Sequence, residues 1–347
     1  MDKLKVNREY EFYCGQDIAF DYIADYISER IGDKDIKDSN ILVVSDRNVG
    51  GYFYSRFEQQ YLEKGVRPEL TIVDARDNYK NLSSVTEVIK SLVDFDFGKG
   101  DWVISLGGGG VLDVTSFACR LYSADINLIC IPTTLNSMAE SSLSGESYIN
   151  SGSHKNVLSV DSVIKAVFID PSFLKTVPQK VATNGYSAII RYAVLADPTL
   201  LKELLDTSDL RVFLERVYET RSKVEKMNPA LLTLGAELAV AIEGYFRFMN
   251  YSEGEALAIS LYSAVPVKYR QALDVLYNKL GLPNRLTGVS GNMILKVLED
   301  GLVRKYNKEL FDIVDLKPGD NTWIVRSVTV DEAMEILKKR TGVICEG

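Results

Sequence analysis

Short apolar runs that alternate with helical repeats restrict the fold of this chain more than any other feature. The clearest run is Trp102–Leu106, which leads directly into four glycines. Short continuous apolar runs are typical of strands that are buried on both faces of a parallel sheet. Runs of this kind occupy Ile41–Val44, Leu70–Val73, Trp102–Leu106, Ile126–Ile131 and Val163–Ile169.

Segments with helical spacing separate these runs. Apolar residues repeat at this spacing across 82–92 and again across 111–118. Strands that alternate with helices predict βαβ units and therefore an α/β domain. Beyond about Asp170 the helical repeat takes over, most clearly at 231–245, 269–280 and 331–337. We therefore expect an α/β domain over residues 1–172 and a mostly α-helical domain over residues 173–347, with the boundary near Asp170–Pro178.

Composition narrows the functional classes. The chain has 347 residues, enough for two domains, and a formal net charge of −8, so nucleic acid is not expected as the main partner. No apolar stretch reaches the length of a membrane span, and the first five residues lack the apolar core of a signal peptide. The four cysteines show no CxxC spacing, which indicates reduced thiols in a cytoplasmic protein.

The scarcity of histidine limits metal and proton-transfer chemistry. His154 is the single histidine in the chain. A zinc site built from several histidines is therefore impossible, and a Ser-His-Asp triad could use only this residue. Its position in a segment rich in serine and glycine predicts a solvated loop.

The glycine turn Gly107–Gly110 lies between a predicted strand and a predicted helix. A junction without β-carbons lets a phosphate approach the backbone N–H groups at a helix N-terminus. Asp113 follows one turn later, where its carboxylate could accept hydrogen bonds from a ribose. A tight turn without a ligand is the structural alternative, and Asp113 would then only complement the helix dipole.

These motifs resemble the dehydroquinate synthase family of sugar phosphate cyclases. The resemblance covers about residues 40 to 260. It implies a Rossmann-like parallel-sheet NAD domain followed by a mostly helical domain, and a homodimer. The matching segments are Gly107–Gly109 with Asp113, Pro132–Leu135, Lys155–Asn156, Ile169–Pro171, Gly185–Tyr192 and Gly254–Ala256.

The same resemblance implies that the NAD-binding side is retained. The matching residues stand where the family places its adenosine, pyrophosphate, ribose and PTT contacts. They are Asp46, Asn48, Asp77, Lys80, Gly107, Gly108, Gly109, Asp113, Thr133, Thr134, Lys155 and Asn156.

The metal-binding side departs from the family pattern. The family binds a divalent metal, usually zinc, through one glutamate and two histidines, and this chain has Ala188, Ala236 and Glu253 at those positions. The expected cofactor is therefore NAD, without zinc or another divalent metal. Positions that contact the phosphate substrate are changed as well, to Ala124, Glu146, Pro229, Thr233 and Val240.

Four functions fit these observations. The chain is a metal-free, degenerate or regulatory relative that binds NAD, or an enzyme with altered sugar-phosphate chemistry. In the second case Lys155, Arg191 or His154 would transfer protons. It is otherwise a non-catalytic subunit that pairs with an intact relative, or a functional 3-dehydroquinate synthase, a phosphate-eliminating lyase, with a rearranged site.

Overall fold

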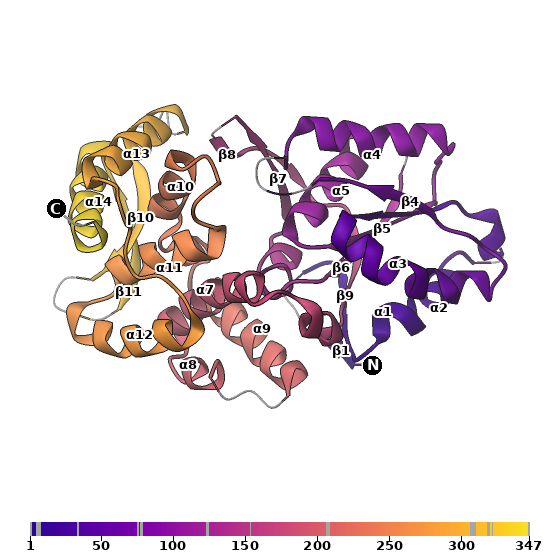
Figure 1. Ribbon diagram of the computed structural model, residues 1–347, viewed down its shortest axis with the longest axis horizontal. Coiled ribbons are helices and arrows are strands. Elements are labelled where there is room, and N and C mark those ends of the chain that lie inside the picture. The colour runs from indigo at the N-terminus through magenta and orange to yellow at the C-terminus, as the bar shows by residue number, and fades with distance from the viewer. Residues whose placement is uncertain are drawn as a thin grey trace. The chain divides into compact units, whose positions relative to one another are not determined.

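The structure is a computed structural model that divides into two compact units, Met1–Pro178 and Gln179–Gly347. The two units are described separately below, with the element labels of Figure 1. The residues described are 2–4, 8–32, 35–74, 76, 79–122, 125–152, 154–205, 209–305, 310–317, 320 and 322–345.

A twisted sheet forms the centre of the N-terminal unit, with strand order β1-β2-β9-β6-β5-β3-β4. Strand β1 pairs antiparallel with β2, and all other pairs are parallel. The five apolar runs expected from the sequence all form strands of this sheet, which confirms the predicted α/β class. The strands are β1 (Asp2–Leu4), β2 (Glu11–Cys14), β3 (Ile41–Ser45), β4 (Glu69–Ile72), β5 (Trp102–Gly107), β6 (Asn127–Pro132) and β9 (Ile164–Ile169).

Helices flank this sheet (Figure 1). The central strands are fully buried, with Leu42, Val103 and Ile129 each 0% exposed, as expected for a parallel sheet with both faces covered. The helices are α1 (Ile18–Asp21), α2 (Ile23–Ser28), α3 (Arg47–Leu62), α4 (Leu82–Asp94), α5 (Gly109–Leu121) and α6 (Leu135–Ala139), with short 3-10 helices at Ile36–Asp38, Ser141–Leu143 and Pro171–Thr176.

A separate antiparallel hairpin, β7 (Glu146–Ser151) and β8 (His154–Asp161), lies between β6 and β9 in the sequence. The sequence did not predict it. His154 is therefore not a loop residue, as the serine- and glycine-rich segment suggested, but the exposed first residue of β8, paired with Ser151. The turn before it passes through Gly152 in the left-handed region, at φ 59°.

The C-terminal unit is mostly helical, as expected. The predicted stripe across 231–245 is interrupted, because Gly235 adopts φ 81° and separates a short 3-10 helix, Pro229–Thr233, from α10. The elements are α7 (Gln179–Ala196), α8 (Leu200–Glu203), α9 (Leu210–Met227), α10 (Ala236–Tyr245), α11 (Glu253–Ala264), α12 (Val267–Leu280), α13 (Gly291–Lys305), α14 (Val330–Ile344) and a hairpin of β10 (Phe311–Leu316) with β11 (Trp323–Val328).

Two properties of the whole chain complete the description. In the part of the chain that the structure describes, no helix is long and apolar enough to cross a membrane. All four cysteines are free thiols, and burial raises the pKa of the Cys119 thiol to about 12.

Candidate functional site

The glycine turn joins the carboxyl end of β5 to the first residue of α5, as the sequence predicted. A β-carbon at Gly107 would lie 2.7 Å from the Val111 side chain, and one at Gly109 would lie 2.5 Å from Ser141 Oγ. Gly108 is the N-cap residue of α5 and offers no capping side chain. Val111 N–H, the third of α5, donates to Gly108 O at 3.0 Å, so the N–H groups of Gly109 and Gly110 are the ones that the start of the helix leaves for an anion.

The next strand, β6, brings two threonines beside this turn. Thr133 donates its backbone N–H to Gly107 O at 3.0 Å, and Thr134 caps α6 through a capping box with Ser137. Thr133 is 2% exposed, and its Oγ1 has no hydrogen-bond partner among the described residues. A buried hydroxyl without a partner is uncommon in proteins and calls for an explanation such as a ligand or water.

Lys80, Asp113 and Asn156 come from three different segments and meet in one cluster. Lys80 Nζ lies 2.6 Å from Asp113 Oδ2 and 3.1 Å from Asn156 Oδ1. The Lys80 and Asp113 side chains are 8% and 14% exposed. The structure thus brings together three of the residues that the family resemblance selected.

The β7–β8 hairpin is attached to this cluster by further hydrogen bonds. Tyr148 N donates to Asp113 Oδ1 at 3.3 Å, and Asn156 N donates to Asn150 Oδ1 at 2.8 Å. Asn150 N in turn donates to Lys80 O at 2.8 Å. Asn156 adopts φ 54°, a left-handed conformation that asparagine tolerates better than most residues. Sequence reasoning missed Asn150, because a polar residue ahead of a glycine turn carries no signal of its contacts.

The remaining predicted cofactor residues differ in their exposure and hydrogen bonds. Asp46 is the N-cap of α3, and its Oδ1 accepts hydrogen bonds from the backbone N–H groups of Asn48 and Val49 at 2.8 and 3.0 Å. Asn48 is exposed on the first turn of that helix, whereas Lys155 on β8 is buried. Asp77 lies outside the described residues.

The three family metal-ligand positions lie on helices that pack together in the C-terminal unit. Helix α11 contacts both α7 and α10. A β-carbon at Gly254 would lie 2.4 Å from the Asn184 backbone, so α7 and α11 approach each other very closely. Ser187 Oγ donates to Gly254 O at 2.6 Å, and Ser260 Oγ donates to Gly235 O at 2.7 Å.

The side chains at these positions do not fit a divalent ion. Ala188 on α7 is 1% exposed, Ala236 is the first residue of α10, and Glu253 is the exposed first residue of α11. A methyl group offers no lone pair, so one potential ligand remains where a catalytic zinc site uses three. In the ranges that the structure describes, no three His, Cys, Asp or Glu side chains form a group that could hold a metal.

The family resemblance singled out two further residues, Arg191 and Glu146. Arg191 on α7 is buried, at 6% exposed, and its guanidinium lies 5.7 Å from the Tyr192 ring centroid. Glu146, the first residue of β7, accepts a hydrogen bond from Tyr148 OH at 2.5 Å. Burial, reinforced by that hydrogen bond, raises the pKa of Tyr148. Ala124 lies outside the described residues.

The fold is that of the sugar phosphate cyclases, with a Rossmann-like N-terminal domain and a helical C-terminal domain. The model of the 3-dehydroquinate synthase N-terminal domain matches residues 70–184. A 3-dehydroquinate synthase of Prochlorococcus marinus (strain MIT 9515) is 30% identical over 284 residues, which is 74% of this chain and 78% of that protein. The chain belongs to the 3-dehydroquinate synthase family.

Solved structures agree on the fold. ValA, a 2-epi-5-epi-valiolone synthase from Streptomyces hygroscopicus subsp. jinggangensis 5008 with NAD+ and Zn2+ bound, has a TM-score of 0.81 at 18% identity and covers 99% of both chains. A 2-deoxy-scyllo-inosose synthase complexed with carbaglucose-6-phosphate, NAD+ and Co2+ has a TM-score of 0.75 at 18% identity, with 97% of this chain and 99% of that chain covered.

Proposed function

We propose that this protein is an NAD-binding member of its family that works without a divalent metal, and that it does not turn over the family's usual substrate. The observation that carries the proposal is a contrast. The Lys80–Asp113–Asn156 cluster stands beside an open helix N-terminus, while Ala188 and Ala236 occupy two of the three metal-ligand positions.

The residues of the N-terminal unit fit a dinucleotide. The turn at Gly107–Gly109 leaves the first N–H groups of α5 for the pyrophosphate, and the Thr133 hydroxyl supplies a buried donor or acceptor nearby. The Asp113 carboxylate would accept hydrogen bonds from a ribose, with Lys80 holding it in place and Asn156 accepting a hydrogen bond from Lys80. Asp46, Asn48, Asp77, Thr134 and Lys155 complete the proposed set.

Bound NAD would supply a hydride acceptor for a hydroxyl group of a sugar-phosphate-like ligand. The proposed roles of the chain's own residues are simpler. Lys155 and Arg191 are buried cations, at 9% and 6% exposed. Each would hold an anionic group, and Lys155 would also transfer a proton, which a guanidinium does not release. Glu146 would repel a phosphate at the position where the family has a lysine, because like charges at short range are unfavourable.

A second candidate is a functional 3-dehydroquinate synthase with a rearranged site. The observation in its favour is the identity of 30% with a protein of that name over most of both chains. A homodimer, or a heteromer with an intact relative, is part of either proposal.

Calorimetric titration of the full chain with NAD, together with metal analysis of the purified protein, tests the first proposal. We expect saturable binding of NAD and no stoichiometric zinc. Asp113→Asn should weaken NAD binding by about tenfold or more, since it removes a charge-assisted hydrogen bond. Glu87→Gln removes the same charge at an exposed position on α4 and should have no effect.

Three results would overturn the proposal. No binding at millimolar NAD would remove the cofactor assignment. Turnover of the family's seven-carbon keto-acid phosphate to dehydroquinate would favour the second candidate, and stoichiometric zinc would contradict the metal-free assignment.

A further inference from the structure

The short 3-10 helix Ser141–Leu143 receives two long-range hydrogen bonds from the segment that precedes β2. Tyr10 OH donates to Ser142 O at 2.9 Å. The Arg8 guanidinium donates to Leu143 O through Nε, at 2.8 Å, and also through Nη2. Ser142 and Leu143 are both 0% exposed. The last carbonyls of a helix lack intrahelical partners, so these two donors satisfy buried acceptors and fix the end of the 3-10 helix.

The first residue of this 3-10 helix places a hydroxyl at the start of α5. Ser141 Oγ lies 2.5 Å from the position that a β-carbon on Gly109 would occupy. Because the amide nitrogen and a β-carbon are bonded to the same α-carbon, Ser141 Oγ lies within about 5 Å of Gly109 N. Ser141 is partly exposed, and its Oγ forms no hydrogen bond with another described residue. The hydroxyl is therefore available to an anion that the N–H groups of Gly109 and Gly110 bind.

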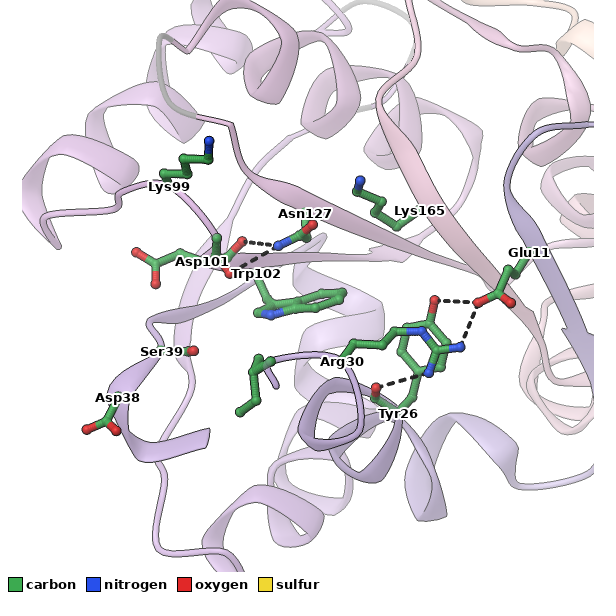
Figure 2. A pocket seen from close by; sticks show the side chains of 12 residues that line it. Glu11, Tyr26, Arg30, Asp38, Ser39, Lys99, Asp101, Trp102, Asn127 and Lys165 are labelled. Atoms are coloured by element: carbon green, nitrogen blue, oxygen red, sulfur yellow. Dashed lines mark hydrogen bonds and ion pairs between the residues drawn. The ribbon is translucent and has the colours of Figure 1, made fainter. Parts of the chain in front are cut away.

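The segment that carries the two donors is anchored by the residue that follows it. Glu11 begins β2 and pairs with Ala166 of β9. Glu11 and Trp102 line the same cavity of the N-terminal unit (Figure 2). There Glu11 Oε2 accepts hydrogen bonds from Tyr26 OH and Arg30 Nη2, at 2.9 and 2.8 Å (Figure 2). These contacts fix the start of β2, so the two donors act from a rigid support.

We propose that Arg8 and Tyr10 are positioning residues for the dinucleotide site. They hold the 3-10 helix so that the Ser141 hydroxyl donates to the pyrophosphate, beside the N–H groups at the start of α5. A hydroxyl that is fixed before binding loses less conformational freedom when the ligand binds, and it therefore contributes more to the affinity. The inference rests on the NAD binding proposed above, and it adds three residues to the proposed set.

A double-mutant cycle tests whether Tyr10 acts through Ser141. The full chain, Ser141→Ala, Tyr10→Phe and the double variant are titrated with NAD by calorimetry. Ser141→Ala should weaken binding by about tenfold, since it removes a hydrogen bond to a charged group. Tyr10→Phe removes only a hydroxyl and should weaken binding by about threefold, because Ser141 is then held less firmly. In the Ser141→Ala background, Tyr10→Phe should cause no further loss.

Arg8→Gln is measured in the same two backgrounds. Its loss of affinity should also disappear when Ser141 is replaced by alanine. If Arg8 instead attracted the anion through its charge alone, the loss would remain in the Ser141→Ala background. The matched control is Tyr122→Phe. Tyr122 OH donates to Phe97 O at 2.9 Å, and Tyr122 lies beyond the opposite end of α5, so this variant should bind NAD normally.

Thermal unfolding of each variant reports whether the fold is intact. Ser141→Ala removes no hydrogen bond within the described chain, so it tests the hydroxyl even if the other variants are less stable. No binding of NAD to the unmodified chain would remove the proposed function and this assignment with it. The positioning role alone is overturned if NAD binds and Ser141→Ala leaves the affinity unchanged. It is also overturned if the losses caused by Tyr10→Phe and Arg8→Gln are the same in both backgrounds.

Discussion

The two units differ in the contacts that hold their candidate site positions. In the N-terminal unit, Lys80, Asp113 and Asn156 come from separate segments and are joined by side-chain hydrogen bonds of 2.6 and 3.1 Å. In the C-terminal unit, the positions of Ala188 and Glu253 also come from separate helices, but the contacts beside them are made by backbone atoms and small side chains.

This difference explains how the proposed loss of the metal site is compatible with an intact fold. The close approach of α7 and α11 depends on Gly254, Asn184 and Ser187, none of which is a family metal ligand. The residues at 188, 236 and 253 can therefore change while the helices stay packed. The residues of the Lys80–Asp113–Asn156 cluster cannot change independently in this way, because hydrogen bonds link them to one another.

The prediction with the largest expected effect tests whether the cluster residues depend on one another. Lys80→Met should lower the free energy of unfolding by about 3 to 5 kcal/mol, because it leaves the Asp113 carboxylate buried without its cation. Lys80→Met/Asp113→Leu should recover part of this loss, since the second substitution removes the buried charge. Denaturant unfolding measures both, with Lys90→Met as the exposed control. If Lys80→Met were as stable as the control Lys90→Met, the cluster would be dispensable for folding.

The packing of the C-terminal unit is tested by a single methyl group. Gly254→Ala should cost about 3 kcal/mol, because the new β-carbon would lie 2.4 Å from backbone atoms of Asn184 and would push α7 and α11 apart. Gly51→Ala on α3 is the matched control. Its β-carbon has no neighbour within 4 Å, so the change should be neutral or stabilise by up to about 1 kcal/mol. A fully stable Gly254→Ala protein would contradict the close-packing argument.

Installing the family ligands tests whether the scaffold still supports a metal site. The triple variant Ala188→Glu, Ala236→His, Glu253→His should gain zinc-dependent stabilisation, of about 2.7 kcal/mol when zinc is present at 100 times its dissociation constant. Thermal unfolding with and without zinc measures it. The matched control is Ala188→Gln, Ala236→Asn, Glu253→Gln. Zinc stabilisation of the unmodified chain by a similar amount would refute the proposed loss of the site.

The sequence predicted the parallel sheet well, because buried strands such as Trp102–Leu106 are continuous apolar runs with clear ends. The sequence predicted less of the structure where burial does not follow the pattern of apolar residues. The β7–β8 hairpin has mixed burial and few apolar runs, so it was missed, and His154 was assigned to a loop. Gly235 interrupts a regular apolar stripe, and spacing alone cannot reveal its positive φ.

The candidate site divides in the same way. The glycine turn was recognisable because strand, glycines and helix are contiguous in the sequence. The hydrogen bonds among Lys80, Asp113 and Asn156 join residues up to 76 positions apart, so only the family pattern could suggest them. No pattern pointed to the cavity at Trp102, because its lining comes from the starts of several strands and the ends of unrelated loops.

The prediction with the smallest expected effect compares the buried Lys80–Asp113–Asn156 cluster with a more exposed polar cluster around Glu11 on β2. Burial of Glu11 opposes its ionisation, but hydrogen bonds from Lys3, Tyr26 and Arg30 outweigh it and lower the pKa of Glu11 to about 2, from 4.5. A lowered pKa in the folded state means that the ionised carboxylate contributes stability above about pH 4.5, and that this contribution is lost as the pH falls toward 2.

Glu11→Gln should therefore lower the free energy of unfolding at neutral pH by up to about 1 kcal/mol, the range of exposed ion pairs, and far less than Lys80→Met. The deficit should shrink as the pH falls from 4.5 toward 2, whereas Glu87→Gln, an exposed control on α4, should show little deficit at any pH. Chemical unfolding across this pH range measures both. A deficit for Glu11→Gln that stays constant with pH would assign its contribution to packing against Tyr26 and Arg30, and the contrast between exposed and buried charge would then not hold for this unit.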